Sequence, residues 1–203
     1  GKFDGQRVTM ASQIAGADET VSSLYSVKSE QATMLSFDTY NYLVHYFGQP
    51  QGSMADDPNG TLGGDYEFVI SDATADRIEL KGKKYGNRIV MKAFSADQTW
   101  KQYLTRIKKV EDDAFFYEYD LRMDGLYTGQ MLRSNYTFIV TYYDEVGKVH
   151  QKTVPFMFTT DGMRFHEPVT IDGQTMQNFV WKNEEISFVC TDEGATEVKL
   201  AGV

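Results

Sequence analysis

The sequence predicts a mainly β fold, a β-rich α+β chain in which two antiparallel meander or lipocalin-like β units are joined through a helix. Short runs of alternating apolar residues are separated by tight turns, and Asp-Gly recurs at 4–5, 124–125, 161–162 and 172–173. Such dipeptides between alternating runs are typical of β-hairpins. The segment 95–110 breaks this rhythm with apolar residues at helical spacing, so we expect hairpins on both sides of a helix.

The individual strands are expected from the period-two alternation of apolar residues, as at Phe68 and Ile70. In the first half of the chain this pattern predicts strands at 65–72, 76–82 and 87–94. In the second half it predicts strands at 134–143, 148–159, 163–170 and 177–190. Successive strands joined by short turns give a meander, in which each strand pairs with its neighbours along the chain.

The longer helix is expected to begin at Ser95, because Gln98 follows three residues later and completes a capping box. Trp100, Leu104 and Ile107 then lie on one helical stripe. This helix divides the chain into three predicted parts. They are an N-terminal β unit over 1–94 with a short helix near 38–47, a connecting helix over 95–112, and a C-terminal antiparallel β unit over 113–203.

The short helix near 38–47 is expected to have Asp38 as its N-cap. Its apolar stripe consists of Tyr40, Leu43, Val44 and Phe47. The remaining side presents Tyr42, His45 and Tyr46. Aromatic side chains outside the apolar stripe either pack against another part of the protein or offer a stacking surface to a ligand. Trp181, in an amphipathic strand, has the same two interpretations.

The composition excludes several classes of function. The chain has 29 acidic and 20 basic residues and a net charge of −9, which repels nucleic acid and anionic lipid surfaces. It has no zinc-protease, serine-hydrolase, P-loop or dinucleotide-binding motif. We therefore expect no catalytic residue, no metal site and no cofactor. A pair of carboxylates brought together by the fold is the enzymatic arrangement that the sequence leaves open.

Two further features have a structural and a functional interpretation. The run 56–60, Asp-Asp-Pro-Asn-Gly, offers oxygen ligands for a hard cation, although it fails the EF-hand spacing and fits a surface turn. Cys190 is the single cysteine, so no disulfide forms within the chain. We expect Cys190 to be a small buried residue, since neighbouring acidic residues would raise the pKa of a reactive thiol.

Four runs resemble a family of Bacteroidetes envelope lipoproteins with a domain of unknown function, DUF4302. They are Ser-Leu-Tyr-Ser-Val-Lys at 23–28, Leu-Ser-Phe-Asp-Thr-Tyr-Asn at 35–41, Gly-Gly-Asp-Tyr-Glu-Phe at 63–68 and Leu-Lys-Gly-Lys-Lys-Tyr-Gly-Asn at 80–87. The resemblance is strongest over 20–95. It implies an exported chain in the cell envelope, at the outer membrane or cell surface, that is lipid-anchored in its precursor and encoded near surface nutrient-uptake systems. It supplies no catalytic residues.

The start of the chain suggests that its export signal lies upstream, because Gly1 to Phe3 lead directly into the first Asp-Gly turn. We expect a non-catalytic binding or accessory module for a glycan, a peptide or a partner protein of the envelope. Its candidate ligand-binding residues are Tyr42, His45, Tyr46 and Trp181. The alternatives are a structural subunit of an envelope assembly and a carboxylate-dependent hydrolase.

Overall fold

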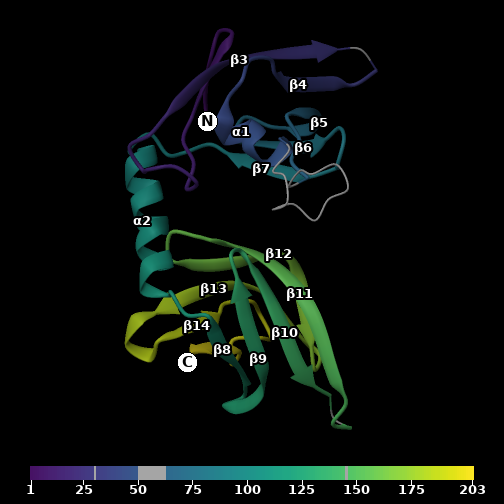
Figure 1. Ribbon diagram of the computed structural model, residues 1–203, viewed down its shortest axis with the longest axis vertical. Helices are drawn as coiled ribbons and strands as arrows, with labels where there is room; N and C mark the ends of the chain where they lie inside the picture. The colour runs from purple at the N-terminus through teal and green to yellow at the C-terminus, as the bar shows by residue number, and fades with distance from the viewer. Residues whose placement is uncertain (30, 50–62, 145) are drawn as a thin grey trace. The chain divides into compact units, whose positions relative to one another are not determined.

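The computed structural model describes residues 1–29, 31–49, 63–144 and 146–203 (Figure 1). The chain folds into two compact units, Gly1–Lys101 and Gln102–Val203. The first contains a seven-stranded sheet and the second a closed barrel, and every strand pair in both is antiparallel. The prediction of a mainly β chain with two antiparallel β units is therefore confirmed.

The N-terminal unit is an open meander in which each strand pairs with the next one along the chain. Its strands are β1 (Lys2–Asp4), β2 (Arg7–Met10), β3 (Val21–Ser29), β4 (Thr33–Phe37), β5 (Glu67–Ala73), β6 (Arg77–Gly82) and β7 (Arg88–Lys92). One face of the sheet buries Val8, Leu35, Phe37, Phe68 and Leu80. The predicted strands 65–72, 76–82 and 87–94 correspond to β5, β6 and β7, because their alternation reflects a single buried face.

A short helix, α1 (Tyr42–His45), continues into the 3₁₀ turn η1 (Tyr46–Gly48). Its N-cap is Asn41, whose side chain accepts a hydrogen bond from the Leu43 amide at 3.1 Å. The prediction of Asp38 as the cap is wrong, because Asp38 directly follows β4 and donates its N–H to the Leu24 carbonyl of β3, which continues the pairing of the two strands by one residue. The helix therefore begins later than expected, and Tyr40 precedes it, 61% exposed.

The C-terminal unit is an up-and-down barrel that closes by pairing β15 with β8. Its strands are β8 (Glu118–Met123), β9 (Leu126–Ser134), β10 (Thr137–Tyr143), β11 (Val149–Phe158), β12 (Gly162–Ile171), β13 (Gln174–Lys182), β14 (Ser187–Cys190) and β15 (Lys199–Gly202). Large side chains fill the interior, among them Tyr119, Phe138, Phe156, Phe165 and Phe188. A small barrel of this kind is stabilised by its own packed side chains.

Turn chemistry explains two of the barrel hairpins. Asp124 and Gly125 have φ of +50° and +78° and join Met123 to its partner Leu126. Positive φ at both central residues is the geometry of a two-residue type I′ turn, for which Asp-Gly is favoured. Asp172 and Gly173 repeat this arrangement between β12 and β13.

The helix α2 (Trp100–Asp113) begins five residues later than the capping box predicts. Ser95 and Gln98 instead form a turn in which the Gln98 N–H donates to the Ser95 carbonyl at 3.1 Å. Ile107 and Val110 of α2 pack into the barrel core. None of the helices in the described part of the chain combines the length and the apolar character needed to cross a membrane.

Cys190 lies at the end of β14 with 1% of its surface exposed, which confirms the prediction of a buried residue. Burial raises the pKa of its thiol to about 11. At neutral pH the side chain is therefore the neutral thiol, the unreactive form.

The predicted strand 177–190 is interrupted by a 3₁₀ turn, η3 (Asn183–Glu185), and by Ile186. Ile186 has φ of +48° and ψ of +46°, the left-handed conformation that β-branched residues rarely adopt. The run Lys-Asn-Glu-Glu at 182–185 places four polar residues in succession at this break, and the apolar alternation resumes only at Ile186.

We expect Ile186→Asn to stabilise the protein by about 0.5–1 kcal/mol, since Asn tolerates the left-handed conformation and Ile186 is 47% exposed. Urea unfolding measures the change. The control is Ile139→Asn, in the regular strand β10 at 37% exposure, which should destabilise. Equal losses in both variants would contradict strain at Ile186.

Candidate functional site

Three aromatic rings, Tyr40, His45 and Tyr66, form a row on the N-terminal unit, and we call them the ring series. The His45 ring lies between the other two, with its centroid 5.4 Å from that of Tyr40 and 5.1 Å from that of Tyr66. His45 and Tyr66 are stacked at 20°, while Tyr40 is tilted by 43°. Tyr40 is 61% exposed and Tyr66 46% exposed. Aromatic surface of this kind is available to a partner or ligand.

Helix α1 holds its part of the ring series against the sheet through Asn41, which is fully buried. The Asn41 side chain caps the helix and also donates to the Ser23 hydroxyl of β3 at 3.2 Å. The Nδ1 atom of His45 lies 2.9 Å from the Asn41 carbonyl oxygen. Asn41, the N-cap of α1, therefore also positions the imidazole of His45.

A close contact between two chain segments brings Tyr66 next to His45. The Gly64 N–H donates to the Phe47 carbonyl at 2.8 Å. A Cβ atom on Gly64 would lie only 2.3 Å from the Cβ of Phe47, so glycine is required for this approach. Tyr66 follows Gly64 and Asp65 in the chain and directly precedes β5. Its ring stacks on that of His45.

The predicted residues Tyr42 and Tyr46 flank the ring series along the chain. The Tyr42 side chain is partly buried, and its hydroxyl donates to the carboxylate of Glu19. This hydrogen bond raises the pKa of Tyr42. Tyr46 is 41% exposed and makes an edge-on contact with Phe47 at 5.2 Å. The binding role of both residues stays a prediction.

Trp181 belongs to the other compact unit, in β13. It is partly buried against the barrel core, with its ring 4.9 Å from that of Phe188 and 6.3 Å from that of Phe116. Its indole N–H donates to the Asn183 side chain at 3.3 Å. The structure thus gives Trp181 a packing role in the barrel, while its predicted ligand contact stays a prediction.

Sequence reasoning placed His45 in the candidate site but missed Tyr40 and Tyr66. Tyr40 was expected on the buried stripe, because the helix was expected to begin before it. Tyr66 was expected to alternate with Phe68 in a strand, but β5 begins one residue after Tyr66. Tyr66 therefore lies outside β5, whose alternation buries Phe68.

Asp65 is a carboxylate with 7% of its surface exposed and a full set of hydrogen bonds. It accepts from the backbone N–H groups of Lys84 and Tyr85 at 2.8 and 3.0 Å. The side chain and backbone N–H of Asn87 donate to it at 2.8 and 3.4 Å. Burial alone would raise the pKa of Asp65, but these donors outweigh it and lower the pKa. Asp65 is therefore an ionised residue that orders the turn 83–87.

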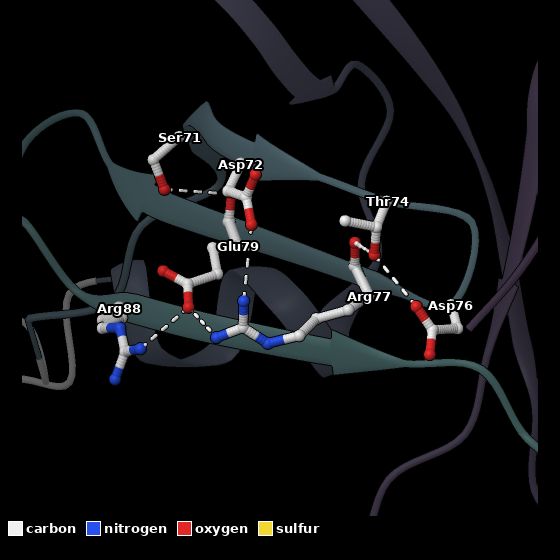
Figure 2. A network of polar contacts seen from close by, with 7 residues as sticks. All are labelled: Ser71, Asp72, Thr74, Asp76, Arg77, Glu79 and Arg88. Carbon is white, nitrogen blue, oxygen red and sulfur yellow. Dashed lines mark hydrogen bonds and ion pairs between the residues drawn. The ribbon is translucent and has the colours of Figure 1, made fainter.

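A polar network lies across β5, β6 and β7 (Figure 2). The carboxylate of Glu79 accepts from Arg77 and from Arg88, in the latter case at 2.9 Å. Arg77 also forms an ion pair with Asp72 at 3.4 Å. In the turn between β5 and β6, the Thr74 hydroxyl donates a hydrogen bond to the Arg77 carbonyl. Asp72, Arg77, Glu79 and Arg88 thus each have a neighbour of opposite charge. We assign this network to cross-strand stabilisation.

The pKa shifts of the carboxyl groups bear on the predicted hydrolase. All Asp and Glu side chains in the described part whose pKa is shifted have it lowered; they are Asp38, Asp65, Asp97, Asp144, Glu185 and Asp192. A lowered pKa is the wrong direction for a general acid, which must hold a proton near neutral pH. The hydrolase stays a prediction without a located acid.

Metal ligation has little support in the described residues. No group of three or more His, Cys, Asp or Glu side chains in the described ranges is placed to hold an ion. The candidate cation run 56–60 lies outside the described residues.

Comparison with known proteins found one family. Residues 1–183 match the family described as "Domain of unknown function (DUF4302)". No curated protein matches the chain. No solved structure matches it either.

Proposed function

This chain belongs to the DUF4302 family, and we propose that it is a non-catalytic binding module of the cell envelope that binds glycans by stacking sugar rings on the ring series. The observation that carries the proposal is the exposure of Tyr40 and Tyr66 on either side of His45. Extended aromatic surface left open to solvent favours a ligand with flat apolar faces and polar edges. Sugar rings have both features.

The proposal also gives the chain an exported location with an upstream lipid anchor. The resemblance of four sequence runs, at 23–28, 35–41, 63–68 and 80–87, to envelope lipoproteins supports this location. The net charge of −9 disfavours nucleic acid as the alternative partner.

We expect Tyr40→Ala and Tyr66→Ala each to weaken glycan binding about tenfold, because one stacked aromatic ring contributes about 1.4 kcal/mol. A glycan array first identifies the sugars that the wild type binds. Calorimetric titration with maltohexaose, cellohexaose and mannohexaose then measures the loss in the variants. Both side chains are exposed, so the variants should keep the melting temperature of the wild type.

The matched control is Tyr127→Ala, which removes a tyrosine that is 54% exposed on the barrel and should leave binding unchanged. Loss of cooperative unfolding in Tyr40→Ala and Tyr66→Ala would show that these rings are structural. Absence of any saturable glycan binding by the wild type would refute the proposal.

A second candidate function, a structural subunit of an envelope assembly, is favoured by the outer face of the barrel. Leu132 and its cross-strand partner Ile139 are 41% and 37% exposed. Tyr143 and its partner Val149 are 50% and 54% exposed. Exposed apolar side chains on neighbouring strands are typical of protein interfaces. Binding to an envelope protein that is lost in Leu132→Ser but kept in Tyr66→Ala would favour this function.

A further inference from the structure

The N-terminal sheet and α1 line an open pocket of about 350 Å³. Its walls come from β2, β4, β5, β6, β7, α1 and η1, and they include Met10, Phe37, Leu43, Phe68, Leu80 and Met91. No residue of the ring series lines it. The pocket is thus a separate feature of this unit, and its size lies at the lower end of the ~300–1,000 Å³ typical of small-molecule sites.

The Asp65 carboxylate and the side-chain NH₂ of Asn87, both at the pocket wall, already have hydrogen-bond partners. The Asp65 carboxylate accepts from four N–H groups of Lys84, Tyr85 and Asn87. The Asn87 side-chain amide donates to Asp65 and to the Gly63 carbonyl, the latter at 2.5 Å. A charged or hydroxylated group placed in the pocket would lose its hydration and find few partners there, which costs free energy.

We propose that this pocket binds the aliphatic chain of an amphiphile, whose polar head stays in solvent. Among the lining residues in the described part of the chain, Asp65 carries the one charge, and it is negative, so an anionic head is disfavoured inside. Met10 and Met91 provide flexible walls that adapt to a chain without a fixed shape. This inference goes beyond glycan binding at the ring series and does not depend on it.

Two exposed lining residues allow the proposal to be tested without disturbing the core. Ile89 of β7 is 37% exposed and Phe47 of η1 is 39% exposed, and both line the pocket. Val90 is 39% exposed but is not part of the lining. Since successive residues of a strand point to opposite faces, Val90→Gln is a matched control for Ile89→Gln.

The probe is decan-1-ol, titrated calorimetrically into the full chain, with circular dichroism to verify that each variant folds. We expect saturable binding of one decan-1-ol per chain. Ile89→Gln and Phe47→Gln should each weaken it at least tenfold, because the bound chain must desolvate the new amide. Val90→Gln and Tyr66→Ala should bind as the wild type does.

Other outcomes overturn the proposal. If the wild type shows no saturable uptake of decan-1-ol, the pocket does not bind aliphatic chains. If uptake is unchanged in both Ile89→Gln and Phe47→Gln, the alcohol binds elsewhere. If Tyr66→Ala abolishes uptake while the two glutamine variants retain it, the ring series is the apolar site. Since Tyr66→Ala also tests glycan binding, failure of one proposal is distinguishable from failure of the other.

Discussion

Replacing Asp65 with alanine is expected to destabilise the N-terminal unit by about 3–5 kcal/mol. The carboxylate is buried and accepts four hydrogen bonds, three of them from backbone N–H groups of the turn 83–87. Hydrogen bonds to a charged group contribute about 1.5–3 kcal/mol each, and donors left without a partner add a desolvation cost. Urea unfolding followed by circular dichroism measures the loss.

The control is Asp4→Ala, because Asp4 is an exposed carboxylate at the end of β1. It should change the free energy of unfolding by less than about 0.5 kcal/mol. Similar losses in both variants would mean that general charge effects, rather than the turn, decide stability.

The same carboxylate predicts a dependence on pH. The pKa of Asp65 in the folded protein is lowered from its ordinary value of 3.8. The ionised carboxylate therefore contributes its full stabilisation of the folded state at pH values above 3.8. This stabilisation is lost as the pH falls through the folded pKa. The difference in unfolding free energy between the wild type and Asp65→Asn should therefore be constant from about pH 7 to pH 5 and shrink below about pH 4. A difference independent of pH down to pH 2 would contradict this account.

The Asp65 turn illustrates what the sequence could and could not predict. Alternation of apolar residues predicted β5, β6 and β7, because a buried sheet face imposes its period on the residues that form it. Asp65 precedes β5 and Asn87 follows β6, so the hydrogen bond between them connects residues that two strands separate along the chain. No local pattern marks such a pair, since Asp and Asn are equally common in surface turns.

The candidate site shows the same division between local and distant information. The aromatic character of the segment around His45 was visible in the sequence. The stacking of Tyr66 on His45 depends on the Gly64–Phe47 approach between segments that are distant in sequence. The short helix was misplaced because both Asp38 and Asn41 are favourable N-caps, and the β3–β4 ladder decides between them.

The second large effect is expected at the ion pair between Glu111 of α2 and Arg133 of β9. The pair spans 3.5 Å, and the side chains are only 14% and 8% exposed. The Arg133 guanidinium also lies 5.0 Å from the ring centroid of Phe158. Glu111 accepts a further hydrogen bond from Tyr136 at 3.2 Å. The pair therefore connects α2 to the barrel wall in a region of low water content.

Glu111→Gln should destabilise the barrel unit by about 3 kcal/mol, because it leaves the buried Arg133 charge without its counter-charge. The double variant Glu111→Leu with Arg133→Met should recover most of this loss. Two apolar side chains need no desolvation, so replacing a whole buried pair is often neutral or stabilising. Urea unfolding of Glu111→Leu, of Arg133→Met and of the double variant gives the coupling between the two side chains.

The same helix supplies the matched control. Lys109 and Asp113 form an ion pair at 2.5 Å with 72% and 31% of their side chains exposed. Asp113→Asn should cost less than about 0.5 kcal/mol, because water screens an exposed pair. If Glu111→Gln costs no more than Asp113→Asn, the buried pair is screened by water as well. The attachment of α2 to the barrel would then depend on the packing of Ile107 and Val110 alone.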